Sequence, residues 1–451
     1  MVNLALLLTL TIRSQSGISV GILWDRLPWF VLLTALWVAI GAVLNIYDLA
    51  RAASVAPSLW ITSIAANLTG LIYLFIPYIT PALPKYRFQA LLFPLFVMTG
   101  VGMWRIFYAK VFAQPIFLQR ALIIGAGSVG RALATAIGAM DTGNGTEFRT
   151  AGYRILGFVD DDVDKGLVVD GLPVLGNCQD LVRLAKELRP DELIVATNER
   201  ENAYGTLYQA VLDCRETGIS ITTMESLYER LMGRVPLEPM DRVLSAVLPL
   251  SPSPMNRFYL ILRRALDIVV SLFGCIFMIL LVPFVWLAHK LSAPGTLFYR
   301  QERIGKSGKR FTLVKFRSMV ADAEKDTGPI WASELDKRIT TIGRIMRRTR
   351  LDELPQFWNV LKGEMSLVGP RPERPEFVSQ LAVGIPFYRA RHAIKPGITG
   401  WAQVRYHYGA SAEDARIKLQ YDLYYIKYRG PYLDLLILMR TIQVIFGSKG
   451  R

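Results

Sequence analysis

The first quarter of the chain consists largely of apolar segments whose length matches the thickness of a lipid bilayer. Three of them follow one another, at Trp29–Leu49, Ser58–Ile79 and Arg87–Tyr108, and a helix needs about 20 apolar residues to cross the hydrocarbon core. Hydrophobic residues make up 52% of the 451 residues and charged residues 20%, which excludes a disordered or collagen-like chain. We therefore expect residues 1–115 to form a bundle of transmembrane helices.

The orientation of this bundle follows from the basic residues beside the third segment. Arg105, Lys110 and Arg120 lie at or after its end, and basic residues concentrate on the cytoplasmic side of a membrane. The apolar segment Met1–Ile12 is too short to span a bilayer, and it lacks the basic start and the cleavage site of a signal peptide. We expect a multi-pass membrane protein whose later domains lie in the cytoplasm.

Residues 116–247 alternate between short apolar runs and amphipathic ones. The pattern predicts strands at 120–124, 153–159, 192–196 and 219–222, with helices over 131–140, 180–188 and 203–217. Such alternation is typical of a parallel, doubly wound α/β sheet. The sequence therefore predicts a Rossmann-like middle domain that ends at the Pro-rich run 248–254.

A glycine motif stands at the start of this domain. Gly125, Gly127 and Gly130 fit the pattern G-x-G-x-x-G between a strand and a helix, where backbone N–H groups can hold a phosphate. Asp160 follows the second predicted strand, the usual place of a ribose-binding acid, although it comes about 30 rather than ~20 residues after the motif. Two interpretations stay open: nucleotide binding without catalysis, and a structural or dimerising module.

The positive charge of the chain is concentrated in its last part. Residues 256–451 hold 32 of the 52 Lys and Arg but only 16 of the 37 Asp and Glu. This part begins with a long apolar segment, Ala265–Ala288, which has basic residues on both sides and Pro283 inside it. The flanks favour two cytoplasmic ends, and proline bends a helix. A re-entrant helix and a kinked fourth span are both compatible with these features.

Charged motifs follow in the rest of this part. An acid pair, Asp352 and Glu353, precedes Pro355, and a basic residue stands between Pro370 and Pro372. The candidates for binding the phosphates of a substrate are Lys315, Arg317, Arg338, Arg371 and Lys395.

The acid pair has two interpretations. Acidic residues ahead of a proline commonly cap a helix. A carboxylate can also attack phosphorus when Mg²⁺ and basic residues neutralise the phosphate charge, and the many basic residues nearby favour this second interpretation. Arg371 suits such a site because a guanidinium group binds two phosphate oxygens at once and its proline neighbours stiffen the backbone.

Through these motifs, residues 256–451 closely resemble the bacterial sugar transferase domain of polyprenyl-phosphate glycosyl-1-phosphate transferases. The similarity runs through 315–319, 351–356, 369–372 and 395–403. The resemblance implies that Asp352 is the nucleophile, that Glu353 assists it in proton handling or in binding Mg²⁺, and that residues 265–288 form a re-entrant membrane helix. Large members of this family also carry N-terminal membrane helices and a Rossmann-like, CoA-binding-type domain.

The family resemblance also implies a reaction. A sugar 1-phosphate moves from a UDP-sugar to undecaprenyl phosphate through an aspartyl phosphosugar intermediate, UMP is released, and synthesis of an exopolysaccharide or another surface glycan begins. The expected place is the cytoplasmic face of the inner membrane, in contact with membrane lipid. Asp352 and Glu353 are the expected ligands of Mg²⁺, and a homodimer is expected. The sequence does not indicate which sugar is transferred.

Two departures from the family pattern accompany the resemblance. Small members break the re-entrant helix at Ser-Pro, whereas this chain has Val282 before Pro283. Large members have four N-terminal spans, and here the first looks truncated at Met1–Ile12. The expected architecture is a helical membrane bundle (1–115), a Rossmann-like α/β domain (116–247) and a mixed α/β transferase domain (248–451) that contains the re-entrant helix.

Other functions fit the sequence less well. A NAD-dependent nucleotide-sugar enzyme of the short-chain type would need a Tyr-x-x-x-Lys base, and neither Lys165 nor Lys186 of the middle domain follows a tyrosine at that spacing. A non-enzymatic scaffold bound to anionic lipid would leave the acid pair unexplained. Nucleic acid is not an expected partner, because the basic residues are interleaved with apolar and acidic motifs.

Overall fold

The computed structural model describes residues 1–14, 26–44, 46–47, 55–76, 80, 89–111, 119–141, 153–162, 166–196, 204–237, 256–292, 295–320, 338–406, 409 and 411–446. The chain forms two compact units, Met1–Leu227 and Tyr228–Arg451. The domain limits expected near residues 115 and 247 lie outside the described residues.

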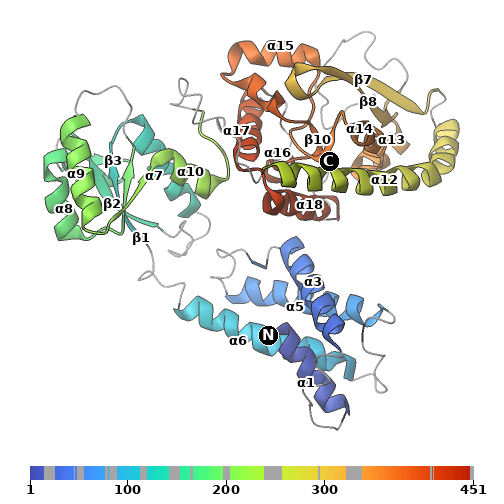
Figure 1. Ribbon diagram of the computed structural model, residues 1–451, viewed down its shortest axis with the longest axis horizontal. Helices are drawn as coiled ribbons and strands as arrows, with labels where there is room; N and C mark the ends of the chain where they lie inside the picture. The colour runs from blue at the N-terminus through green and yellow to red at the C-terminus, as the bar shows by residue number, and fades with distance from the viewer. Residues whose placement is uncertain are drawn as a thin grey trace. The chain divides into compact units, whose positions relative to one another are not determined.

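The first unit begins with apolar helices, as expected. They are α1 (Val2–Ser14), α3 (Leu27–Val43), α5 (Val55–Leu74) and α6 (Gln89–Val111). Buried side chains such as Leu33, Ala65 and Val97 form a common core, and Figure 1 shows the four helices packed together. Helices α5 and α6 contain stretches long and apolar enough to cross a membrane, whereas α3 ends at Val43 and has 17 residues.

The first unit continues as a six-stranded sheet in the order β3-β4-β2-β1-β5-β6. The strands are β1 (Gln119–Ile124), β2 (Tyr153–Val159), β3 (Val168–Val169), β4 (Leu172–Gly176), β5 (Glu192–Val195) and β6 (Ser220–Thr223). All pairings are parallel except that of β3 with β4. Strand β1 is central, and its residues 121–124 are completely buried, as expected for a parallel strand covered on both faces.

Three helices cover this sheet. They are α7 (Ser128–Asp141), α8 (Leu181–Leu188), which follows the short helix η2 (Cys178–Asp180), and α9 (Tyr204–Glu216). Figure 1 shows α8 and α9 on one side of the sheet and α7 on the other. The predicted doubly wound α/β fold is therefore confirmed, while the sequence analysis missed the short strands β3 and β4. The next helix, α10 (Met224–Met232), contains the boundary between the two units.

The second unit is a mixed α/β domain built on one long helix. Its elements begin with α12 (Asn256–Ser292), the antiparallel hairpin β7 (Phe298–Ile304) and β8 (Arg310–Phe316) joined by η3 (Lys306–Gly308), α13 (Thr341–Arg348), η4 (Leu351–Glu353) and α14 (Gln356–Lys362). They continue with β9 (Ser366–Val368), α15 (Pro375–Gly384), η5 (Tyr388–Ala393), β10 (Gly397–Thr399), which pairs in parallel with β9, α16 (Trp401–Arg405), α17 (Ala412–Tyr428) and α18 (Pro431–Phe446).

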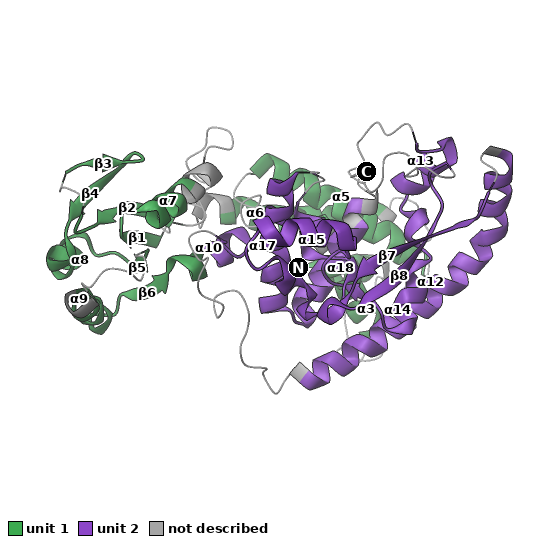
Figure 2. Ribbon diagram, turned by 90° about the horizontal axis from the view of Figure 1, so that it is seen from above, with its two compact units in different colours: residues 1–227 green, residues 228–451 purple. Residues whose placement is uncertain are grey.

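Helix α12 continues without a break over 37 residues and contains Pro283. Figure 2 shows that the helix is bent rather than straight, and proline is a known cause of bends. Polar and small residues spaced by four, including Tyr259, Asp267 and Ser271, are buried against the domain, whereas most apolar side chains of α12 are exposed. A helix whose exposed side is this apolar meets lipid more favourably than water.

The segment that follows α10 belongs to the core of the second unit. Val235 and Leu237 are buried in its main hydrophobic cluster. The Trp401 indole donates a hydrogen bond to the Gly233 carbonyl at 2.7 Å, and the Lys427 ammonium contacts the buried Glu229 carboxylate at 2.9 Å. Residues 229–237 therefore contribute to the core of the second unit.

Candidate active site

A sharp turn brings the acid pair into the interior of the second unit. Helix α13 ends at Arg348, and Arg350 then takes a left-handed backbone conformation (φ 58°) before the short helix η4. Such a conformation is uncommon for a residue other than glycine. Asp352 and Glu353 follow in η4 and are buried, with 6% and 7% of their surfaces exposed. The structure thus places both predicted carboxylates in one buried turn.

Glu353 is bound by basic residues. Its Oε1 atom accepts hydrogen bonds from Arg371 at 2.8 Å and from Lys315 at 3.1 Å, and the Arg350 guanidinium lies 3.9 Å away. Burial alone would raise the pKa of Glu353, but these three cations hold the pKa well below its usual range. Glu353 is therefore ionised and fixed in position.

Asp352 has a different environment. Its Oδ1 atom is buried and has no hydrogen-bond partner among the described residues. Burial raises the pKa of Asp352, and Lys315, Arg347 and Arg350 oppose this rise without cancelling it. An ion whose oxygen is desolvated but not hydrogen-bonded is more basic and more nucleophilic than a paired one. The two adjacent acids therefore differ in the property that matters for attack on an electrophile.

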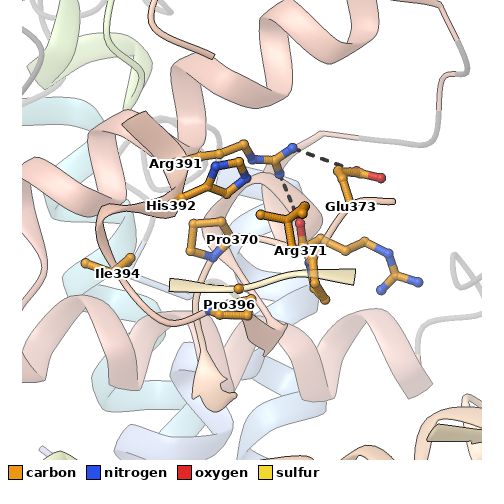
Figure 3. A pocket seen from close by; sticks show the side chains of 10 residues that line it. Pro370, Arg371, Glu373, Arg391, His392, Ile394 and Pro396 are labelled. Atoms are coloured by element: carbon orange, nitrogen blue, oxygen red, sulfur yellow. Dashed lines mark hydrogen bonds and ion pairs between the residues drawn. The ribbon is translucent and has the colours of Figure 1, made fainter. Parts of the chain in front are cut away.

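Arg371 links the acid pair to the rest of the domain. Pro370, Arg371 and Pro372 line a small pocket together with Arg391. Figure 3 shows the Arg391 guanidinium directed at the Arg371 carbonyl oxygen, to which it donates a hydrogen bond at 3.1 Å, and at Glu373, whose carboxylate lies 3.9 Å away. Arg391 thus fixes the backbone of Arg371, while the Arg371 side chain contacts Glu353.

Arg391 is itself held by a buried ion pair. Its Nη2 atom lies 2.7 Å from the Asp422 carboxylate, and its Nη1 atom donates to the Tyr388 hydroxyl at 2.7 Å. Burial raises the pKa of Asp422 to about 6, against the influence of Arg391. Sequence analysis missed both Arg391 and Asp422 because they are 31 positions apart and belong to no recognised motif.

The other predicted phosphate-binding residues are distributed around the domain. Arg317 is buried directly after the end of β8. The Arg338 carbonyl accepts a hydrogen bond from the Val320 N–H at 2.9 Å, beside the bridge between Met319 and Ile339. The structure thus places the backbone of Arg338 next to the segment that follows β8.

Lys395 lies elsewhere in the domain. The charged groups that influence its ammonium are Arg264, Asp267, Lys306 and Arg263, rather than the acid pair. Conversely, the basic residues that act on the acid pair include Arg347 and Arg350, which the sequence analysis did not select. Their spacing on and after α13, three residues apart and next to the buried Met346, is the signal that could have identified them.

The glycine motif of the middle domain has the expected position but an internal partner. It connects β1 to α7, and a Cβ atom at Gly130 would lie 2.0 Å from the Gly125 carbonyl oxygen. The Asp160 carboxylate accepts hydrogen bonds from the Ala126 N–H at 2.5 Å and from the Asp162 N–H at 2.8 Å. Asp160 therefore stabilises the loop itself, and both interpretations of the motif stay open.

Two family models match the chain. The model of the bacterial sugar transferase matches residues 258–448, and that of a CoA-binding domain matches residues 42–224. The first contains the acid pair and the basic residues that act on it, and the second contains the glycine motif.

Curated relatives carry related names. The chain is 38% identical over 260 residues to a UDP-N-acetylgalactosamine-undecaprenyl-phosphate N-acetylgalactosaminephosphotransferase of Aeromonas hydrophila, which covers 57% of this chain and 60% of the relative. It is 32% identical over 363 residues to a UDP-glucose:undecaprenyl-phosphate glucose-1-phosphate transferase of Escherichia coli, which covers 78% and 76%. The exopolysaccharide production protein PSS of Rhizobium leguminosarum is 40% identical over 191 residues, 41% of this chain and 94% of that protein.

Proposed function

Because the chain belongs to the bacterial sugar transferase family, we propose that it transfers a sugar 1-phosphate from a UDP-sugar to undecaprenyl phosphate and releases UMP. The reaction would begin the synthesis of an exopolysaccharide or another surface glycan. The names of the relatives support both substrates. The observation that carries the proposal is the contrast between the two acids: Glu353 is bound by cations, and the buried Asp352 Oδ1 atom has no hydrogen-bond partner among the described residues.

The proposed chemistry has two steps at one phosphorus atom. An oxygen of Asp352 attacks the β-phosphorus of the UDP-sugar, the bond from this phosphorus to the bridging oxygen breaks, and UMP leaves with the electron pair. An oxygen of undecaprenyl phosphate then attacks the same phosphorus and displaces the Asp352 carboxylate. The overall reaction exchanges one phosphoric anhydride bond for another of similar energy, and the intermediate between the two steps is a mixed carboxylic–phosphoric anhydride on Asp352. Positioning and charge neutralisation therefore supply most of the catalysis.

The basic residues around the acid pair serve this chemistry. Arg371 and Lys315 fix Glu353, which keeps one negative charge next to Asp352 and so maintains the basicity of the nucleophile. Arg347 and Arg350 also act on Asp352, and together with Arg317 and Arg338 they provide candidates for binding the diphosphate. Guanidinium groups suit this task because each presents paired donors to phosphate oxygens.

Mg²⁺ fits this site. Magnesium takes oxygen ligands and is commonly held by one or two carboxylates together with substrate phosphates, and Asp352 retains a buried oxygen with no hydrogen-bond partner among the described residues. No group of three or more His, Cys, Asp or Glu that could hold a metal occurs among the described residues, so substrate oxygens and water would complete the shell. Asp352 and Glu353 would hold the ion, which would neutralise charge on the diphosphate.

The membrane segments have a place in this proposal. Helix α12 exposes apolar side chains over most of its length and bends, which supports a re-entrant helix that enters and leaves the cytoplasmic side of the inner membrane. A site attached to such a helix meets a lipid-linked acceptor at the bilayer surface. The homodimer is part of the same proposal, and light scattering of the purified protein would measure it.

The proposal is tested with Asp352→Asn. Amide oxygen is a poor nucleophile, so UMP release should fall by at least about a thousandfold. Intact-protein mass spectrometry of wild type given a UDP-sugar without acceptor should show a phosphosugar adduct, which Asp352→Asn should lack. Glu376→Gln, at an exposed acid of α15, is the matched control and should behave as wild type.

Wild-type activity in Asp352→Asn would refute the assignment of the nucleophile. A panel of UDP-sugars in the same assay would identify the sugar.

Removal of Mg²⁺ with a chelator should stop UMP release, and restored Mg²⁺ should recover it.

A further inference from the structure

A second cluster of basic side chains lies at the other end of α14 from the acid pair. Gly363 ends this helix with a left-handed backbone (φ 85°). A side chain at position 363 would begin 3.4 Å from the Lys395 ammonium and 3.5 Å from the Arg264 guanidinium. Two cations therefore converge on a point of the surface that glycine leaves open.

The positive charge of this cluster is not neutralised within the described part of the chain. Arg264 donates to two carbonyl oxygens, those of Val360 at 2.7 Å and Leu361 at 2.8 Å, which carry no net charge. Lys395 forms no ion pair with any described carboxylate. The exposed Lys306 of η3 adds a third positive charge to the surroundings of Lys395.

One acid influences Lys395, and it is engaged elsewhere. Asp267 is buried, and its Oδ1 atom accepts hydrogen bonds from the Leu367 N–H at 2.9 Å and the Ser366 hydroxyl at 3.1 Å. The pKa of Lys395 is lowered overall despite Asp267. Burial is the largest cause, and the positive charges of Arg264 and Lys306 lower the pKa further. Like charges brought together in this way are stabilised by an anion.

Apolar side chains adjoin the cluster. Ile261 and Ile268, three and four residues from Arg264 on the same face of α12, are exposed. On α14, the ring of the half-exposed Trp358 lies under the Lys362 ammonium, 5.7 Å from its centre. Tryptophan and lysine occur together where a protein meets the headgroup region of a bilayer. The cations thus lie at an edge between apolar and polar surface.

The cluster is separate from the reacting carboxylates. Asp352 and Glu353 precede the first residue of α14, and Gly363 follows its last. At 1.5 Å per residue, the seven-residue helix separates the two places by about 10 Å. A phosphate held by Lys395 is therefore out of reach of a nucleophile at position 352.

We propose that Arg264, Lys306 and Lys395, here called the lipid-phosphate cluster, bind the phosphate of a membrane lipid outside the reacting site, with the lipid chains along the exposed face of α12. An anionic phospholipid and the polyprenyl phosphate acceptor both carry a phosphate group attached to long lipid chains. The proposal rests on the membrane contact of α12 within the proposed function, and it goes beyond that function by adding a second phosphate site.

The test measures lipid bound to the full chain without any UDP-sugar. The protein is placed in nanodiscs of neutral phosphatidylcholine with added phosphatidylglycerol in one arm and undecaprenyl phosphate in the other, and retained lipid is counted by native mass spectrometry. Lys395→Gln should reduce retention about fivefold in at least one arm, and adding Lys306→Gln should reduce it again by a similar factor. Lys309→Gln, at an exposed lysine next to η3, is the matched control.

The arms distinguish the source of the phosphate. Loss confined to phosphatidylglycerol assigns the cluster to bulk lipid, and loss confined to undecaprenyl phosphate assigns it to the acceptor. Equal retention by wild type and Lys395→Gln in both arms overturns the proposal. Asp352→Asn should bind lipid as wild type does, so a failed nucleophile assignment would leave this result intact.

Discussion

At the scale of single residues, the proposed reaction depends on the protonation state of one carboxylate, that of the proposed nucleophile. Asp352 must be ionised to attack phosphorus, and burial raises its pKa above the usual value of an aspartate. The rate of UMP release should therefore rise with pH through this raised pKa and fall as the carboxylate is protonated below it. The basic neighbours Lys315, Arg347 and Arg350 lower the pKa of Asp352, so they keep the acidic limb of the pH–rate profile from moving to still higher pH.

Arg347 gives a direct test of that statement. It lowers the pKa of Asp352, and its Nε atom donates to the Ser318 hydroxyl at 2.8 Å. Arg347→Gln removes the charge, so the acidic limb of the pH–rate profile should shift to higher pH. Arg344→Gln, on the exposed side of the same helix, should leave the limb unchanged, and identical limbs in all three proteins would contradict the electrostatic explanation.

A second residue-scale prediction concerns Arg391, which acts through Arg371. Arg391→Met removes the donor to the Arg371 carbonyl and leaves Asp422 buried without its partner. Because a small displacement of a positioned group can cost about 100-fold in rate, kcat for UMP release should fall by about that factor, with a smaller change in KM. Arg391→Lys should recover part of kcat, since an ammonium keeps the charge but not the paired geometry.

Arg389→Met is the control for this experiment, because Arg389 is exposed in the same short helix η5. Equal loss of folded protein in the Met and Lys variants at position 391, with unchanged kcat in what remains, would show that Arg391 supports the fold alone.

At the scale of elements, the contact of α12 with α14 joins the long apolar helix to the helix that follows the acid pair. A Cβ atom at Gly274 would lie 2.4 Å from the Phe357 ring, so the two helices meet there without room for a side chain. Gly274→Ala should force them apart and lower the free energy of unfolding by about 1–3 kcal/mol. Thermal unfolding in detergent would measure this as a lower Tm.

Gly384→Ala provides the comparison, because nothing lies within 4 Å of a Cβ atom at that position of α15. It should be neutral or slightly stabilising. Equal Tm values for the two variants would mean that α12 and α14 are not in close contact.

The elements also show what could be predicted from the sequence. The doubly wound sheet follows from apolar runs that alternate with amphipathic ones, and β1 and β5 lie where the pattern puts them. Strands β3 and β4 were missed because two and five residues carry too little periodicity. The acid pair was found because its residues are adjacent in a recognisable motif.

Contacts between residues far apart in the chain could not be predicted from the sequence. Arg391 meets Asp422 across 31 residues, and Arg263 of α12 donates to the Ser366 hydroxyl at 2.9 Å across 103. No local pattern encodes such a pair, because the distance between its members is set by the packing of whole helices. The left-handed turn at Arg350 was also hidden, since arginine carries no preference for it.

At the scale of the whole molecule, the second unit contains the acid pair and the basic residues that act on it. The similarity to the relative from Rhizobium leguminosarum covers 41% of this chain but 94% of that protein. We expect a truncated chain that begins at residue 224 to fold and to release UMP from its UDP-sugar.

A chain that begins at residue 256 is the informative comparison. It lacks Val235 and Leu237 of the main core, the Gly233 carbonyl that accepts from Trp401, and the Glu229 carboxylate that contacts Lys427. Losing two buried aliphatic side chains and these contacts should destabilise it by several kcal/mol. Similar Tm and activity in both truncated chains would show that residues 228–237 are dispensable.

The unequal environments of the two adjacent acids have a consequence for covalent inhibitors. Diazo reagents esterify protonated carboxyl groups, and the raised pKa of Asp352 keeps it protonated to higher pH than Glu353, whose pKa is held down by its cations. A diphosphate mimic that carries such a warhead should therefore modify the first of these neighbours and spare the second. Selectivity of this kind would come from electrostatics alone, in a dipeptide whose members differ by one methylene group.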